Sequence, residues 1–164
     1  GHSAGAHIAS LVHYDQRYLE RAGASLTACG FVGLAGPYDF LPLVSPTLKD
    51  IFPAALRDAS QPVNFVDGFE GPALLIHGLQ DDIVKPRNSA SLAESVRQAG
   101  GEAELRIFED RGHLGVLLGM SQPLRFLAPI LDAVSDFVNR QECADGSSQA
   151  PADNSRSAYS RMSL

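Results

Sequence analysis

The sequence predicts an α/β protein in which a parallel sheet lies between two layers of helices, a three-layer αβα sandwich. Apolar runs without polar alternation, typical of strands buried on both faces, occur at 28–35 and 73–77. An amphipathic helical pattern is clearest at 87–99, where apolar side chains recur on one face and glycines follow. Strand and helix alternate along the chain, and this favours parallel strands joined by right-handed crossovers.

The first part of the chain predicts a helix, a strand and an irregular excursion. A helix is expected over 4–21, where apolar side chains recur at helical spacing: Ile8, Leu11, Val12 and Leu19. The strand at 28–35 is broken by a Gly-Pro pair, and we expect Asp39 to cap the turn that follows. Prolines then interrupt the pattern, so residues 38–71 are predicted to form a cap-like excursion with short helices at 45–51 and 53–59.

The second part predicts two more strands and two more helices. The strand at 73–77 is followed by the helix at 87–99 and a third strand at 104–108. A last helix is expected over 123–140, with a kink or a start near Ala128 because Pro129 lies inside the pattern. Residues 142–164 are polar with almost no large apolar side chains, which predicts a disordered tail after one domain at 1–141.

Composition and charge exclude several classes of partner. The net charge is -6 and no basic cluster stands out, which argues against nucleic acid and anionic membrane surfaces. No apolar run reaches the roughly 18 residues that span a bilayer. The two cysteines are too few for a disulfide framework or a metal site, and Cys29 is expected to be a small buried apolar residue. This pattern favours a reducing compartment, and we expect a cytoplasmic location.

The most informative motif is Gly1-His2-Ser3-Ala4-Gly5, a Gly-x-Ser-x-Gly pattern. The pattern is typical of a sharp strand-to-helix turn that raises a serine hydroxyl above a sheet. We expect both glycines to be required because the turn leaves no room for a Cβ atom on either side of the serine. Ser3 is therefore a candidate nucleophile.

A serine hydroxyl is a weak nucleophile, and it needs a base that is itself oriented by an acid. Asp81 lies just past the strand at 73–77, and His113 follows the strand at 104–108 within a glycine-containing loop. The carboxyl ends of parallel strands meet at one edge of the sheet, so these side chains are expected near Ser3. Asp82 stays open as the alternative acid, and both carboxylates would otherwise flank the helix that starts near Arg87.

Three motifs together resemble the α/β-hydrolase esterase/lipase superfamily. They are the serine turn at residues 1–5, called the elbow from here on, the segment 77–86 (His-Gly-Leu-Gln-Asp-Asp-Ile-Val-Lys-Pro), and Gly112-His113. Within it they are most similar to small carboxylesterases, with hormone-sensitive-lipase-like, feruloyl-esterase-like and kynurenine-formamidase-like members. The likeness covers residues 1 to about 140 and implies the C-terminal part of that fold, without its N-terminal half. It further implies Ser3 as the nucleophile, Asp81 as the acid, His113 as the base and the Ala4 N–H as an oxyanion donor.

The resemblance implies a serine hydrolase that cleaves small carboxylic esters through an acyl-enzyme, without a metal or organic cofactor. The family's second oxyanion donor comes from a His-Gly-Gly loop that this sequence lacks, so we expect the chain by itself to be impaired or inactive. Two alternatives stay open: an arylformamidase or serine-peptidase C-terminal domain, and a catalytically silent fragment that binds or supports a partner. Candidates for shaping a substrate pocket, or for ordinary burial, are the apolar residues of the excursion: Phe40, Leu43, Ile51, Phe52 and Phe65.

Overall fold

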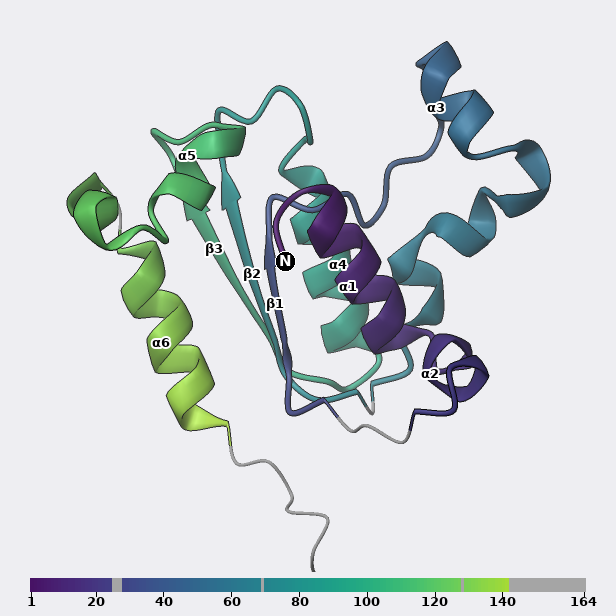
Figure 1. Ribbon diagram of the computed structural model, residues 1–164, viewed down its shortest axis with the longest axis horizontal. Helices are drawn as coiled ribbons and strands as arrows, with labels where there is room; N and C mark the ends of the chain where they lie inside the picture. The colour runs from purple at the N-terminus through teal and green to yellow at the C-terminus, as the bar shows by residue number, and fades with distance from the viewer. Residues whose placement is uncertain (25–27, 69, 128, 142–164) are drawn as a thin grey trace, which may run out of the picture.

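The computed structural model describes residues 1–24, 28–68, 70–127 and 129–141. In these residues the centre of the molecule is a sheet in the order β1-β2-β3, formed by β1 (Phe31–Leu34), β2 (Ala73–Gly78) and β3 (Ala103–Phe108). Both strand pairs are parallel, as Figure 1 shows. The predicted parallel α/β architecture is confirmed, although β1 is shorter than the run at 28–35.

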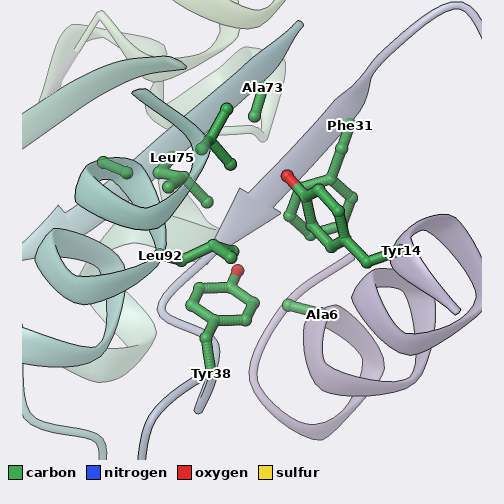
Figure 2. Close-up of a cluster of buried hydrophobic side chains, with 9 residues drawn as sticks. Ala6, Tyr14, Phe31, Tyr38, Ala73, Leu75 and Leu92 are labelled. Atoms are coloured by element: carbon green, nitrogen blue, oxygen red, sulfur yellow. The ribbon is translucent and has the colours of Figure 1, made fainter. Parts of the chain in front are cut away.

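Helices cover both faces of the sheet (Figure 1). On one face lie α1 (Ala4–Tyr14) and α4 (Arg87–Gln98), and on the other lie α5 (His113–Leu118) and α6 (Ile130–Arg140). All six residues of β2 are buried, and its side chains alternate between two cores. Ala73 and Leu75 join the core beneath α1 and α4, shown in Figure 2 with its Tyr and Phe rings, whereas Leu74 and Ile76 join the core beneath α5 and α6. This is the predicted three-layer arrangement.

The expected helix over 4–21 is broken into α1 and α2 (Arg17–Arg21). The break lies at Asp15, whose carboxylate accepts the Arg17 backbone N–H at 3.2 Å and the Arg17 guanidinium at 2.7 and 2.8 Å. Such a local side-chain bond competes with continuation of the helix. The predicted apolar face is also wrong in part, because Ile8 is 63% and Val12 36% exposed. The buried face of α1 consists instead of Ala6, His7, Ser10, Leu11 and Tyr14.

The excursion after β1 contains short helices, as expected, at α3 (Pro46–Ile51), η1 (Ala54–Leu56), η2 (Asp58–Ser60) and η3 (Pro62–Phe65). Buried amide side chains fasten its first residues to the fold. Asn88 Oδ1 accepts the Tyr38 and Asp39 N–H groups at 3.0 and 2.9 Å. The Asp39 carboxylate accepts the Ser91 hydroxyl at 2.7 Å, so its described side-chain contact is with α4.

The C-terminal part differs from the prediction in two places. The short helix α5 was not expected, because six residues carry too little periodicity for its recognition. The predicted helix over 123–140 divides into η4 (Gln122–Leu127) and α6, which begins directly after Pro129. Proline fixes φ and lacks an N–H, so it suits a helix start better than a helix interior. Ala128 and the predicted tail at 142–164 lie outside the described residues.

Cys29 is half-buried and disulfide-bonded, whereas the sequence predicted a small buried apolar residue. The other cysteine of the sequence, Cys143, lies outside the described residues. Within the described residues, no helix has the length and apolar character that crossing a membrane requires.

Candidate active site

The segment that carries Ser3 runs alongside β1 before it turns into α1. His2 forms a parallel bridge with Leu34, and the Ser3 N–H donates to the Leu34 carbonyl at 2.9 Å. Ser3 has φ 54° and ψ -125°, a conformation that ordinary residues rarely adopt. Non-glycine residues in such strained conformations are concentrated at functional sites.

The two glycines of the elbow are not equivalent. A Cβ atom on Gly1 would lie 2.6 Å from the Gly5 carbonyl oxygen, so the turn requires glycine there. A Cβ on Gly5 meets nothing within 4 Å in the described part of the chain. The prediction that both positions are crowded is therefore wrong for Gly5.

Two backbone hydrogen bonds join the loop after β2 to the loop after β3. The Leu79 N–H donates to Phe108 O at 2.9 Å, and the Gln80 N–H donates to Arg111 O at 2.9 Å. The approach is so close that a Cβ on Gly78 would lie 2.2 Å from the Arg111 carbonyl oxygen. The two loops thus form one unit at the carboxyl edge of the sheet, with His113 as the first residue of α5.

The structure brings three of the predicted residues into one hydrogen-bonded chain. His113 Nε2 lies 2.8 Å from Ser3 Oγ, and His113 Nδ1 lies 2.7 Å from Asp81 Oδ2. The carboxylate has no proton to give, so Nδ1 is the donor to Asp81 and Nε2 accepts the serine proton. This tautomer leaves Nε2 ready to remove the proton from Ser3.

The Asp81 carboxylate is held from several directions. Its Oδ1 accepts the N–H groups of Ile83 and Val84, each at 2.9 Å. Burial alone would raise the pKa of Asp81, but the bonds from His113, Val84 and Ile83 outweigh it and hold the pKa below its usual value. Asp82 points elsewhere: its exposed carboxylate pairs with Lys85 at 2.8 Å. Of the two candidate acids, the geometry favours Asp81.

Two further histidines, His2 and His77, contact this chain of groups. His2 Nε2 lies 3.0 Å from the His113 backbone carbonyl, with the two rings 4.8 Å apart. His77 is fully buried, and its Nε2 lies 3.2 Å from Asp81 Oδ2. A detectable signal for His77 is its i,i+4 spacing from Asp81 across a glycine turn.

Ala4 supplies an available backbone donor beside Ser3. It is the first residue of α1, so its N–H has no acceptor within the helix, and none is recorded elsewhere in the described residues. The partial positive charge at a helix N-terminus adds to its attraction for an anionic oxygen. Its N–H can therefore serve the predicted oxyanion role.

The candidate pocket residues of the excursion have different surroundings. Leu43 is buried and Phe65 packs against the core, whereas Ile51 is 59% exposed. The rings of Phe40 and Phe52 lie 5.3 Å apart and each makes an edge contact with His7. Since His7 is one helical turn after Ser3, these contacts place both rings against the N-terminal part of α1.

No cluster of side chains suited to hold a metal ion occurs among the described residues. The arrangement instead unites a hydroxyl, an imidazole, a carboxylate and a backbone donor. These groups can move a proton and stabilise a developing oxyanion without a bound ion.

The sequence matches the family model described as the prolyl oligopeptidase family over residues 47–139. This range contains Asp81 and His113 and begins after Ser3. No curated protein sequence matches the chain.

Several solved structures share its architecture. An acetyl ester-xyloside bifunctional hydrolase from Caldicellulosiruptor lactoaceticus has a TM-score of 0.65 and 22% identity, over 87% of this chain and 56% of that one. A carboxylesterase from Lactobacillus plantarum WCFS1 has a TM-score of 0.69 and 16% identity, over 85% of this chain and 56% of that one. An acylaminoacyl peptidase from Pyrococcus horikoshii has a TM-score of 0.64 and 19% identity, over 86% of this chain and 23% of that one.

At these identities the similarity shows the fold alone, which is that of part of an α/β-hydrolase. The chain spans about half the length of the bifunctional hydrolase and of the carboxylesterase, 56% in each case.

Proposed function

Because this chain belongs to the prolyl oligopeptidase family, we propose that it is the triad-bearing part of a serine hydrolase that cleaves carboxylic esters. The observation that carries the proposal is the unbroken hydrogen-bonded chain from Ser3 through His113 to Asp81. The strained conformation of Ser3 and the unpaired Ala4 N–H support it. In this proposal Ser3 is the nucleophile, His113 the base, Asp81 the acid and Ala4 an oxyanion donor.

In the first step Ser3 Oγ attacks the substrate carbonyl carbon while His113 Nε2 takes the hydroxyl proton. The carbonyl oxygen becomes an oxyanion, to which the Ala4 N–H donates, and Asp81 stabilises the imidazolium. One such donor is worth about 3–4 kcal/mol in the transition state. As the bond to the leaving oxygen breaks, His113 returns the proton to the departing alcohol.

The second step releases the acyl group. Water attacks the acyl carbon and gives a proton to His113, which then returns it to Ser3 Oγ as the carboxylic acid departs. Each proton that leaves an oxygen atom is taken by the same nitrogen, so the cycle ends with the starting enzyme. The side chains that carry these steps all belong to this chain.

A serine peptidase is the second candidate function, and the family match favours it specifically. Solved structures with this fold include both carboxylesterases and acylaminoacyl peptidases. Alkoxide is a better leaving group than amide nitrogen, so ester cleavage makes the smaller demand on a site with a single described oxyanion donor. We therefore place ester substrates first.

The test compares p-nitrophenyl acetate and butyrate with a peptidyl p-nitroanilide, using the longest natural polypeptide that contains these residues. Ester hydrolysis that is lost in Ser3→Ala is the expected result. Preference for the anilide, measured as kcat/KM, would favour the peptidase. Absence of both activities would favour a catalytically silent domain.

A further inference from the structure

His77 is a buried histidine with a defined hydrogen-bonding state. Its Nε2 faces two acceptors, the Val84 carbonyl at 2.9 Å and Asp81 Oδ2 at 3.2 Å, so the ring proton is on Nε2. Its Nδ1 lies 2.7 Å from Ser89 Oγ and accepts the serine hydroxyl. Burial lowers the pKa of His77, which keeps the ring neutral.

This ring completes the set of donors around the acid. Asp81 Oδ2 accepts the His113 Nδ1–H and lies 3.2 Å from His77 Nε2, while Oδ1 accepts two backbone N–H groups. His77 also binds the carbonyl of Val84, the residue whose N–H donates to Oδ1. One ring therefore fixes both the carboxylate and the loop that carries it.

We propose that His77 is a positioning residue that acts through Asp81, by fixing Oδ2 and drawing part of its negative charge away from His113. The inference depends on the proposed function only in that Asp81 orients the base. A hydrogen bond to an ionised carboxylate reduces the charge that it presents to its other partners. Without the His77 bond, Asp81 would stabilise the His113 imidazolium more strongly but would be less firmly oriented.

The titratable groups that act on His77 come from the two joined loops. Asp81 and His113 face His77 across the joined loops, and Ser89 faces it from α4. His2, from the elbow, faces His113. Asp81 contacts both rings, so it links a change at His77 to the base.

The test compares His77→Gln with His77→Leu in the longest natural polypeptide that contains the chain. The Gln amide can still donate to Asp81 and Val84, whereas Leu removes the donor. We expect His77→Leu to lower kcat about 10-fold, the scale of loss on removing a group that orients another, with KM unchanged. The acidic limb of its pH–rate profile moves to higher pH by about 0.5–1 unit, the worth of one hydrogen bond to a charged group. His77→Gln is expected to stay close to the parent in kcat and in its pH–rate profile.

Proton NMR provides a readout that needs no turnover. The His113 Nδ1–H proton, bound to Asp81, is expected at low field in the parent, further downfield in His77→Leu and unchanged in His77→Gln. If the protein is inactive but the proton signal shifts as expected in His77→Leu, the proposed function is contradicted and this inference is supported. An unchanged proton signal in His77→Leu, or equal losses in Leu and Gln without any pH shift, would overturn it.

Ser89→Ala keeps the proposal testable if His77→Leu does not fold, because Ser89 holds the ring without contacting Asp81. We expect a smaller change in the same direction as in His77→Leu. Ser91→Ala on the same helix is the matched control, since its hydroxyl binds Asp39 instead. Coincident NMR spectra and pH profiles for Ser89→Ala and Ser91→Ala would contradict the proposal.

Discussion

The two halves of the candidate site differ in how completely their polar groups are paired. On the acid–base half, Asp81 accepts three hydrogen bonds and contacts His77, which uses both ring nitrogens. On the nucleophile half, the Ala4 N–H has no described acceptor and Gly5 faces open space in the described residues. The acid–base half forms between two adjacent strands of the same sheet, so this chain supplies all of its contacts.

The nucleophile half leaves apolar side chains exposed in the described residues. Ile8 and Val12, on the helix that follows Ser3, stay exposed although they are apolar. A donor that binds an oxyanion must be unpaired in the resting enzyme, which explains why the Ala4 N–H has no described acceptor. It does not explain why the apolar side chains of Ile8 and Val12 are exposed. We therefore expect the effect of a substitution on the acid–base half to be the same in this chain and in a longer polypeptide. The effect of a substitution on the nucleophile half is expected to differ between the two.

The largest effect is expected for the nucleophile and the base. Ser3→Ala and His113→Ala should each lower kcat for ester hydrolysis by about 10⁴–10⁶-fold, because either change removes the proton-transfer pair. The double variant should lose little more than either single one, since the residues act as a unit. Additive losses, measured by steady-state kinetics, would show that Ser3 and His113 work separately.

The next largest effect separates the adjacent acids. Asp81→Asn should lower kcat by about 10³–10⁴-fold, because the amide no longer stabilises the imidazolium or selects its tautomer. Asp82→Asn should change kcat less than about twofold, since its exposed pair with Lys85 contributes little. A greater loss of kcat in Asp82→Asn than in Asp81→Asn would show that Asp82, and not Asp81, is the acid.

The elbow glycines give a smaller, structural contrast. Gly1→Ala should destabilise the protein by about 1–3 kcal/mol because its Cβ meets the Gly5 carbonyl. Gly5→Ala should be neutral or stabilising by about 0.5–1 kcal/mol, since alanine favours the first turn of α1. Urea unfolding of both variants measures this. If Gly5→Ala is harmful only in a longer polypeptide, residues beyond this chain cover the elbow.

The smallest expected effect is a pH dependence of stability from buried histidines. Burial lowers the pKa of His13 from 6.5 to about 4, so its contribution is present above pH 6.5 and is lost as the pH falls toward 4. We expect a loss of about 1–2 kcal/mol over this window after allowance for partial exposure. The lowered pKa values of His7 and His77 act in the same direction.

His13→Phe provides the control, because phenylalanine keeps the stacking on Phe31 and cannot titrate. Urea midpoints at neutral and mildly acidic pH should differ less in this variant than in the parent. An identical difference in both proteins would show that His13 does not contribute to the pH dependence.

The fold was predictable where periodicity and strong local signals agree. The buried runs and the helix at 87–99 indicated the sheet and its crossover, and Pro129 marked the start of α6. The break at Asp15 was not predicted, because it depends on a side-chain bond to Arg17 that competes with the helix. Ile8 and Val12 were assigned to the buried face of α1 but are exposed, because a sequence pattern shows which residues are apolar and not which are covered.

The candidate site was predictable to the level of chain order and loop position. Those signals directed attention to Ser3, Asp81 and His113, which the structure brings within hydrogen-bond distance of one another. They could not supply the contact of His2, since a ring that binds a distant backbone carbonyl leaves no repeat in the sequence. His77 is indicated only by its i,i+4 spacing from Asp81. Nor could they separate the crowded Gly1 from the open Gly5.

The most direct measurement is covalent labelling with a fluorophosphonate, with the modified residue located by peptide mass spectrometry. An activated serine at the end of the observed chain of hydrogen bonds should be labelled at Ser3, rapidly in the parent and far more slowly in His113→Ala. Labelling at another residue, or equal rates with and without the His113 imidazole, would contradict an active triad.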